Sequence, residues 1–99
     1  MTVNIQYVQL DHSESLDAFI EKHLEKLTKK YEWLISADVS IKEDAKDNVN
    51  GKICSIELSL PGPRIFATSN ERNYELAVKE TINDLEKQLK KRKEIFKTH

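Results

Sequence analysis

The residues with the clearest chemical potential are the bases that crowd the C-terminal end of the chain. From residue 87 to residue 99 there are six lysines and arginines against one acid, Glu94. Cationic groups at this density bind anions, such as the phosphates of a nucleic acid or of a membrane surface. A solvated helix end whose lysines complement the helix dipole produces the same pattern. The six bases are Lys87, Lys90, Lys91, Arg92, Lys93 and Lys97.

Further bases lie in the first half of the chain, on a segment whose apolar residues recur every three or four positions. At 100° per residue, the acids of this predicted helix fall on one flank of its apolar face and the bases on the other. A face that serves solubility alone more often mixes the signs at i,i+4 spacing, so the segregation favours an anionic partner. In the last predicted helix, Lys79, Lys90 and Lys97 fall roughly opposite the apolar face. The acids of the first helix are Glu14, Asp17, Glu21, Glu25 and Glu32, and its bases are Lys22, Lys26, Lys29 and Lys30.

The net charge hides this arrangement. The 99 residues carry a formal charge of −1, yet residues 1–49 hold ten acids and six bases, and residues 50–99 hold seven acids and ten bases. The hydrophobic fraction of 38% suffices for one small core, and the charged fraction of 33% indicates a soluble chain. There is no apolar run of about 18 residues, no secretory signal and only one cysteine. We therefore expect one cytoplasmic domain over residues 1–99.

Residues that could carry out catalysis or hold a metal are sparse. Cys54 lies on the apolar side of an alternating segment, which is typical of a core residue rather than a nucleophile. The histidines, His12, His23 and His99, have no serine or cysteine at a catalytic spacing. The acidic residues of 44–51 lack calcium-loop spacing, and both glycines fall in turns rather than in a phosphate loop. The sequence therefore predicts no catalytic residue, no metal and no cofactor, and the chain is not expected to be an enzyme.

Two familiar nucleic-acid modules fit poorly. A stacking platform for single strands needs aromatics on an exposed sheet face, and the predicted strands contain only Tyr7 and Phe66. A double-stranded-RNA domain is expected to place lysines at the start of its last helix, whereas this chain has them at the end. A basic helical surface is thus the favoured anion-binding element.

Six elements must position these side chains. Alternation of apolar and polar residues predicts strands over 2–10, 37–42, 54–60 and 64–69. Ser13 is a good cap for a five-turn helix whose apolar face runs from Leu16 to Leu34. Asn70 is the expected cap of a long final helix, and Asn50-Gly51 is a hairpin-turn dipeptide. The core face of the final helix is predicted to hold Tyr74, Ala77, Val78, Ile82, Leu85, Leu89 and Phe96.

The resulting order, β-α-β-β-β-α, constrains the topology. A strand, helix and strand in one sheet form a right-handed crossover between parallel strands, and short turns make the later strands antiparallel. The expected fold class is α+β: a two-layer domain with a four-stranded sheet and both helices on one face. The other sheet face carries residues such as Asp38, Ser40, Ser55 and Glu57, which suits solvent.

Several stretches of the chain resemble the ribosome hibernation promoting factor family, also known as ribosome-associated inhibitors, in its short form. The similarity begins with Val3-Asn4-Ile5, continues through residues 13–16 and 23–27, and is most specific over residues 82–93. This last stretch, which contains Lys87-Gln88-Leu89-Lys90, looks like the family's leucine-x-(Lys/Arg)-Gln-Leu-x-Lys signature. Because the sequence ends at His99, the resemblance leads us to expect a short-form protein, without the linker and dimerisation domain of the long form.

The resemblance implies a function. Family members are non-enzymatic regulators of translation under stress that bind 16S rRNA of the small ribosomal subunit near the decoding centre. There they block the tRNA and mRNA sites. The implied partners are therefore 16S rRNA and ribosomal proteins, with no membrane and no small-molecule substrate, and the protein is expected to be monomeric off the ribosome. The alternative is a protein–protein adaptor that uses the acidic flank of the first helix to bind a basic partner.

The resemblance also implies which bases contact rRNA. The family's rRNA-contacting bases lie on both helices, and the charge pattern of this chain adds further candidates to the matched positions. The matched positions are Lys26, Lys29, Lys87, Lys90, Lys91 and Lys93, and the additions are Lys22, Lys30, Lys79, Arg92 and Lys97.

Overall fold

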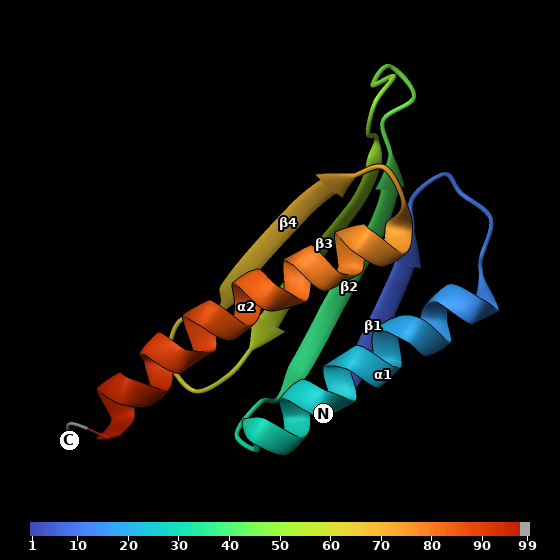
Figure 1. Ribbon diagram of the computed structural model, residues 1–99. Helices are drawn as coiled ribbons and strands as arrows, with labels where there is room; N and C mark the ends of the chain where they lie inside the picture. The colour runs from blue at the N-terminus through green and yellow to red at the C-terminus, as the bar shows by residue number, and fades with distance from the viewer. Residues whose placement is uncertain (98–99) are drawn as a thin grey trace.

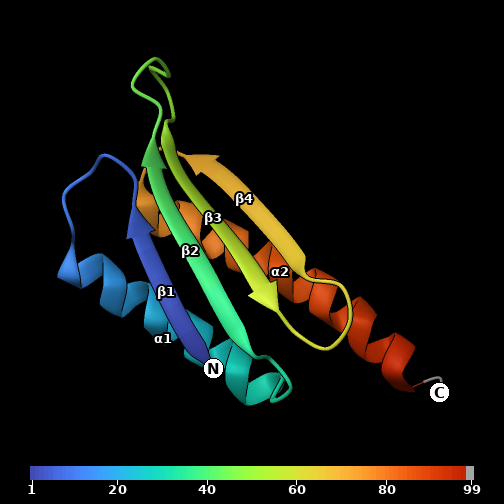
Figure 2. The same cartoon turned by 180° about the vertical axis from the view of Figure 1, so that it is seen from behind.

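The computed structural model describes the backbone of residues 1–97 and the side chains as far as Ile95, and its elements follow the predicted β-α-β-β-β-α order (Figure 1). The sheet order is β1-β2-β3-β4, with β1 parallel to β2 and the other neighbours antiparallel. Figure 2 shows both helices behind the sheet, on one face. The predicted two-layer α+β fold is therefore confirmed. The elements are β1 (Thr2–Tyr7), α1 (Glu14–Lys30), β2 (Ser36–Glu43), β3 (Lys52–Ser59), β4 (Ile65–Glu71) and α2 (Tyr74–Lys97).

The core lies between the sheet and the helices and follows the predicted alternation. Val39 of β2 stands opposite Ile56 of β3, and both side chains are buried against the helices. Cys54 is fully buried, as expected for a core residue. Thr81 is the buried polar residue of α2; its hydroxyl lies 2.8 Å from the Ala77 carbonyl oxygen and 3.1 Å from that of Cys54. These contacts satisfy the hydroxyl and hold α2 against the sheet.

Helix α1 is shorter than its apolar periodicity predicts. The Tyr31 N–H still donates to the Leu27 carbonyl oxygen at 2.8 Å, but Tyr31 has ψ 79° and leaves the helix. Tyr31 and Leu34 nevertheless remain buried. Their apolar spacing therefore reports burial beyond the end of the helix, which periodicity alone does not distinguish from further helical turns.

The cap of α2 is Asn73, and the prediction of Asn70 is wrong. Asn70 remains within β4, where its Oδ1 accepts from the Gly51 N–H at 2.7 Å. Asn73 Oδ1 accepts from the Leu76 N–H at 2.8 Å, which is the geometry of a helix N-cap. The two asparagines are three residues apart, so strand pairing decides which of them is free to cap. Of the predicted core face of α2, Phe96 lies outside the described side chains.

Replacement of Asn73 with alanine is expected to lower the free energy of unfolding by about 1 kcal/mol, because a free helix N–H loses its acceptor. The measurement is urea denaturation followed by far-ultraviolet circular dichroism. Asn83→Ala is the matched control, since Asn83 is exposed in the interior of α2. Equal stability of the two variants would contradict the capping role.

The strand ends also depart from the prediction. Strand β1 ends at Tyr7 rather than Leu10 because Gln9 has a left-handed φ of 57°, which ends the extended chain. Between β2 and β3, residues 44–51 form the polar connection that the sequence predicts, and β3 begins at Lys52 rather than at Cys54. Gly51 closes this loop at φ 116°, where a Cβ would lie 2.6 Å from the Asp44 carbonyl oxygen. Only glycine fits this position without a shift of the backbone.

Candidate nucleic-acid interface

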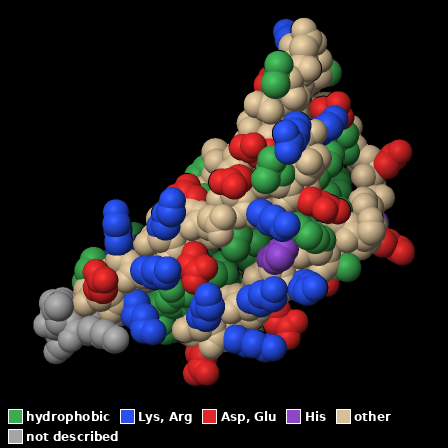
Figure 3. Space-filling model, viewed as in Figure 1, with side chains coloured by type: hydrophobic (Ala, Val, Ile, Leu, Met, Phe, Trp, Pro, Cys, Tyr) green, Lys and Arg blue, Asp and Glu red, His purple; other side chains and the backbone are tan. Residues whose placement is uncertain are grey.

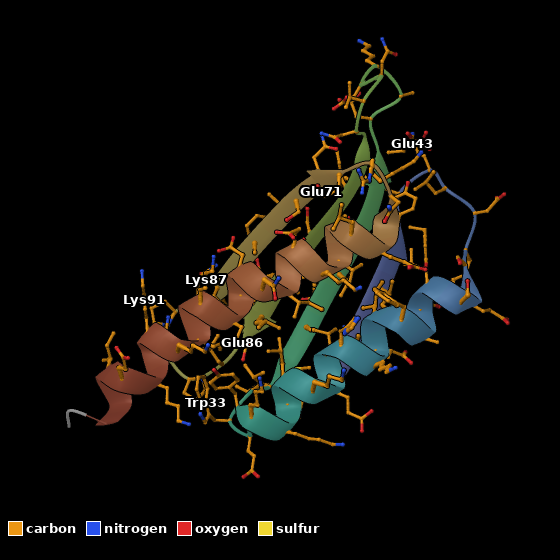
Figure 4. All side chains as sticks on the ribbon, viewed as in Figure 1. Trp33, Glu43, Glu71, Glu86, Lys87 and Lys91 are labelled. Carbon is orange, nitrogen blue, oxygen red and sulfur yellow. The ribbon has the colours of Figure 1, made fainter. Side chains whose placement is uncertain are left out.

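The basic side chains gather on the side of the molecule that carries the helices. Figure 3 shows lysine and arginine side chains spread over both helices on this face. The helices are joined across their seam by an ion pair, in which Lys30 Nζ lies 2.9 Å from Glu86 Oε2. Figure 4 shows Glu86 on the side of α2 that faces α1, whereas Lys87 and Lys91 point away from α1. We call the surface along which α1 and α2 meet, around the Lys30–Glu86 ion pair, the inter-helix seam.

Two lysines of α2 extend toward α1. Lys79 Nζ lies 5.9 Å from the ring centroid of Phe19, and Lys93 Nζ lies 5.8 Å from that of Tyr31. Both distances fall within the range of cation–π attraction. The wheel arithmetic placed Lys79 opposite the core. In the structure the Lys79 side chain lies in the inter-helix seam instead, because α1 packs beside α2 on the same sheet face.

His23 shows that bases from both helices converge. Its ring packs edge-to-face against Phe19 with centroids 4.4 Å apart, and its buried Nε2 has no hydrogen-bond partner among the described residues. Burial lowers the pKa of His23 below its usual range, and the charges of Lys26, Lys79 and Lys22 lower it further. Lys22 and Lys26 come from α1 and Lys79 from α2, so one imidazole senses the positive potential of both helices.

Replacement of Lys79 with glutamine is expected to raise the pKa of His23 toward its ordinary value, because one repelling charge disappears. Nuclear magnetic resonance titration of the imidazole protons gives this pKa directly. Lys42→Gln, a charge loss on the open sheet face, should leave it unchanged. In the wild type the neutral imidazole contributes stability above about pH 6.5, and this stability is lost as pH falls through the lowered pKa. An unchanged His23 pKa in the Lys79 variant would contradict the convergence of lysines from both helices on this imidazole.

The remaining predicted bases have varied surroundings. Lys90 and Lys87 line one hollow of about 220 Å³ on α2, together with Glu80, Asn83 and Glu86. Lys29 forms an exposed pair with Glu25 at 3.6 Å, which is worth little in stability and leaves the ammonium accessible. The side chain of Lys97 lies outside the described residues.

Arg92 has a structural contact instead of a free guanidinium. Its Nη1 donates to the Pro61 carbonyl oxygen at 3.2 Å and its Nη2 to that of Pro63 at 3.0 Å. These bonds tie α2 to the turn between β3 and β4. Its place in the basic run predicted an rRNA contact, but two of its donors are committed to the fold.

Part of the acidic flank of α1 is also committed within the domain. The Tyr7 hydroxyl lies 2.8 Å from Asp17 Oδ1 and 2.9 Å from the Ser13 carbonyl oxygen, and His12 contacts the other Asp17 oxygen. Burial, followed by the bond to Asp17, raises the pKa of Tyr7 to about 12. Asp17 therefore positions the loop before α1, while Glu14, Glu21 and Glu32 are exposed.

Groups with catalytic potential are not arranged for chemistry in the described part of the chain. Burial raises the pKa of the Cys54 thiol to about 11, which disfavours the nucleophilic thiolate. Asp47 accepts from the backbone N–H groups of Asn50 and Val49, and these bonds hold its pKa low within a polar turn. The described residues include no group of three or more metal-ligating side chains, and none of their helices is long and apolar enough to cross a membrane.

Sequence reasoning missed two residues of the inter-helix seam. Glu86 is 56 positions from Lys30, so no local spacing connects them. The sequence shows His23 only as a histidine without a catalytic partner, and its lysine neighbour on α2 depends on tertiary packing. An i,i+4 pattern cannot reveal either contact, because the relevant partner lies on another helix.

Comparisons with known proteins agree with the fold. The solved structure of a ribosomal subunit interface protein from Coxiella burnetii has a TM-score of 0.83 and 22% identity, covering 94% of this chain and 98% of that one. The N-terminal domain of Protein Y from Thermus thermophilus has a TM-score of 0.78 and 20% identity, covering 92% of this chain and 98% of that one. No curated protein matches the sequence.

The family model is the decisive comparison. The model described as "Sigma 54 modulation protein / S30EA ribosomal protein" matches residues 3–97, which is nearly the whole chain. The same residues carry the resemblance to hibernation factors that the sequence predicted. The chain therefore belongs to the Sigma 54 modulation protein / S30EA ribosomal protein family.

Proposed function

We propose that this protein is a cytoplasmic translation inhibitor that binds 16S rRNA of the small ribosomal subunit near the decoding centre and excludes tRNA and mRNA. Family membership supports the coarser statement, that the chain is a ribosome-associated protein of the hibernation and interface class. It acts by occupancy and carries out no reaction. The partners are rRNA and the ribosomal proteins around it, and the protein is monomeric off the ribosome.

The convergence of lysines from both helices carries this proposal. Lys26 of α1 and Lys79 of α2 act on the same imidazole, and Lys93 reaches across to Tyr31. A set of ammonium groups on two rigid helices neutralises phosphates and releases their counterions. Phosphate contacts position a protein without reading sequence, so selectivity comes from the shape of the folded rRNA. We call Lys26, Lys79, Lys90 and Lys93 the seam lysines.

Two flanks of α2 divide the rRNA-binding role. Lys79 and Lys93 extend toward aromatic rings beside α1, and Lys26 lies near His23. Lys90 lines a hollow beside Glu86, whereas Lys87 and Lys91 are exposed and point away from α1 (Figure 4). In the proposal the seam lysines contact one stretch of rRNA backbone, and the outer pair contacts phosphates beyond it. Arg92 contributes by holding the β3–β4 turn rather than by binding phosphate.

Co-sedimentation with purified small subunits tests the proposal most directly. The protein is expected to pellet with small subunits, to be released as salt rises, and to remain in the supernatant with large subunits alone. Salt release is expected because each neutralised phosphate contributes to the salt dependence of binding. If the protein stays in the pellet at every salt concentration, or binds both subunits equally, an rRNA-phosphate interface on the small subunit is contradicted.

A further inference from the structure

A second concave surface lies at the other end of α2 from the basic run. It is an open hollow of about 700 Å³ between the start of each helix and the ends of β1 and β2. Its floor contains Leu16 and Ile41, which are buried in the core, and the half-buried side chains of Leu10 and Tyr74. A concavity of this size accommodates one or two side chains of a peptide. We call it the acidic hollow.

The charged residues that line the acidic hollow are all acids. They are Asp11, Glu43 and Glu75. Glu43 is paired with Lys52 at 3.0 Å, and Lys52 also lies 5.6 Å from the ring centroid of Tyr74. Asp11 and Glu75 are exposed, and no salt bridge joins them to the described residues. Among the described residues, the hollow therefore offers two exposed carboxylates without an ion pair, above an apolar floor.

The two helix N-termini at the hollow do not favour an anion. Ser13 Oγ accepts from the Leu16 N–H at 3.2 Å, and Asn73 Oδ1 accepts from the Leu76 N–H at 2.8 Å. Each cap thus occupies one of the N–H groups that a helix N-terminus leaves free. The first turns also carry the acids Glu14, Asp17 and Glu75, which repel negative charge. The charge around the hollow complements a cation.

The walls are held in place before any partner arrives. The loop after β1 is anchored where the Val8 N–H donates to the Ile41 carbonyl oxygen at 2.9 Å, and again where the Tyr7 hydroxyl contacts Asp17. On the other wall, the Tyr74 hydroxyl donates to the Lys42 carbonyl oxygen at 3.1 Å. A fixed concavity lowers the conformational cost of binding.

We propose that the acidic hollow docks a basic peptide segment of a partner protein, with an apolar side chain on the floor and flanking arginine or lysine side chains at Asp11 and Glu75. This inference goes beyond the proposed rRNA contact and uses a different surface. Apolar burial supplies the anchor, and the exposed carboxylates select the sign of the flanking charge.

Titration of the isotope-labelled protein with the peptide acetyl-Arg-Leu-Arg-Leu-Arg-amide, followed by nuclear magnetic resonance, tests this inference without a ribosome. Shifts are expected to concentrate at Leu10, Leu16 and Tyr74. Asp11→Asn combined with Glu75→Gln should weaken binding about fivefold, the scale of two exposed charge contacts. The matched control, Asp84→Asn with Glu94→Gln, removes the same charge elsewhere on α2 and should bind as the wild type does.

Two further peptides separate the alternatives. Arg-Ser-Arg-Ser-Arg should bind more weakly, because serine cannot fill the apolar floor, and Glu-Leu-Glu-Leu-Glu should not bind. Equal binding of the serine peptide, or shifts scattered over the surface, would reduce the effect to general charge attraction and overturn the proposal. Preference for the acidic peptide would make the hollow an anion site and overturn it as well. Neither result bears on sedimentation with small subunits.

Discussion

Replacing the four seam lysines with glutamine is expected to weaken binding to small subunits about a thousandfold at 0.1 M salt, if each lysine neutralises one phosphate. The log–log slope of affinity against salt should become shallower by about three, because each of the four lost phosphate contacts contributes about 0.7 to 0.9 to the slope. The effect should fade toward 1 M salt, where counterion release no longer drives binding. Measurement of the dissociation constant at several salt concentrations gives both quantities. An unchanged slope would remove the inter-helix seam from the binding surface.

The matched control removes the same total charge from elsewhere. Lys42, Lys46, Arg64 and Arg72 are exposed and lie on the open sheet face, in the 44–51 loop and at the two ends of β4. Their replacement by glutamine should change the salt slope little. The seam lysines are exposed too, so each substitution should change stability by about 0.5 kcal/mol or less. Native circular dichroism in both variants is required before the affinities are compared.

A double replacement, Lys87→Gln with Lys91→Gln, measures the outer flank of α2 separately. If both flanks contact phosphates, this double variant should lower the salt slope by about half as much as the four-lysine seam variant does. Because Lys87 and Lys90 line one hollow beside Glu86, the two losses should not be fully additive in free energy.

Neutralisation of Glu14, Glu21 and Glu25 separates rRNA binding from the adaptor alternative. If RNA is the partner, glutamine at these positions preserves or strengthens binding, because repelling charges disappear. An adaptor that binds a basic protein through this flank loses affinity instead, and is indifferent to the seam lysines. Asp17 is left intact, since its contacts with Tyr7 and His12 belong to the fold.

Most of the fold could be predicted because each element carries its own periodic signal. A helix between the first two strands dictated their parallel pairing, and the alternation through Val39 and Ile56 defined the buried sheet face. One error lies where two residues compete for one role, and the others lie at the ends of α1 and β1, where a turn of the backbone ends the element before the apolar pattern does. Asn70 and Asn73 are chemically identical caps, and the bond of Asn70 to Gly51 decides between them.

The site was harder to predict because a helical wheel gives an angle about one axis but not the position of the neighbouring helix. Lys79 and Lys87 both appeared as solvent-facing bases, yet one reaches Phe19 of α1 and the other points away. Arg92 belongs to the basic run, yet its guanidinium bonds to the carbonyl oxygens of Pro61 and Pro63. These two residues lie in a turn about thirty residues earlier, so local spacing does not reveal the contact. The residue types indicated an anion-binding surface, whereas its shape depended on tertiary packing.

The protein and tRNA are expected to compete for the same space on the small subunit. The folded domain measures 47 × 24 × 18 Å, so at the decoding centre it would fill space that a tRNA anticodon arm needs. The two ligands should then bind one at a time. With tRNA at ten times its own dissociation constant, the apparent dissociation constant of the protein should rise about elevenfold, and it should keep rising in proportion as more tRNA is added.

Proportionality is the informative part of this competition. Coupling between two separate sites raises the apparent dissociation constant only to a plateau set by the coupling free energy, whereas exclusion from one space has no plateau. Filter binding of labelled tRNA to small subunits, at increasing protein concentration, should therefore reach the background level. An isolated anticodon stem-loop should compete as intact tRNA does, because the remainder of the tRNA lies away from the decoding centre. A plateau, or a complex that contains both ligands, would leave rRNA binding in place but remove occupancy as the means of inhibition.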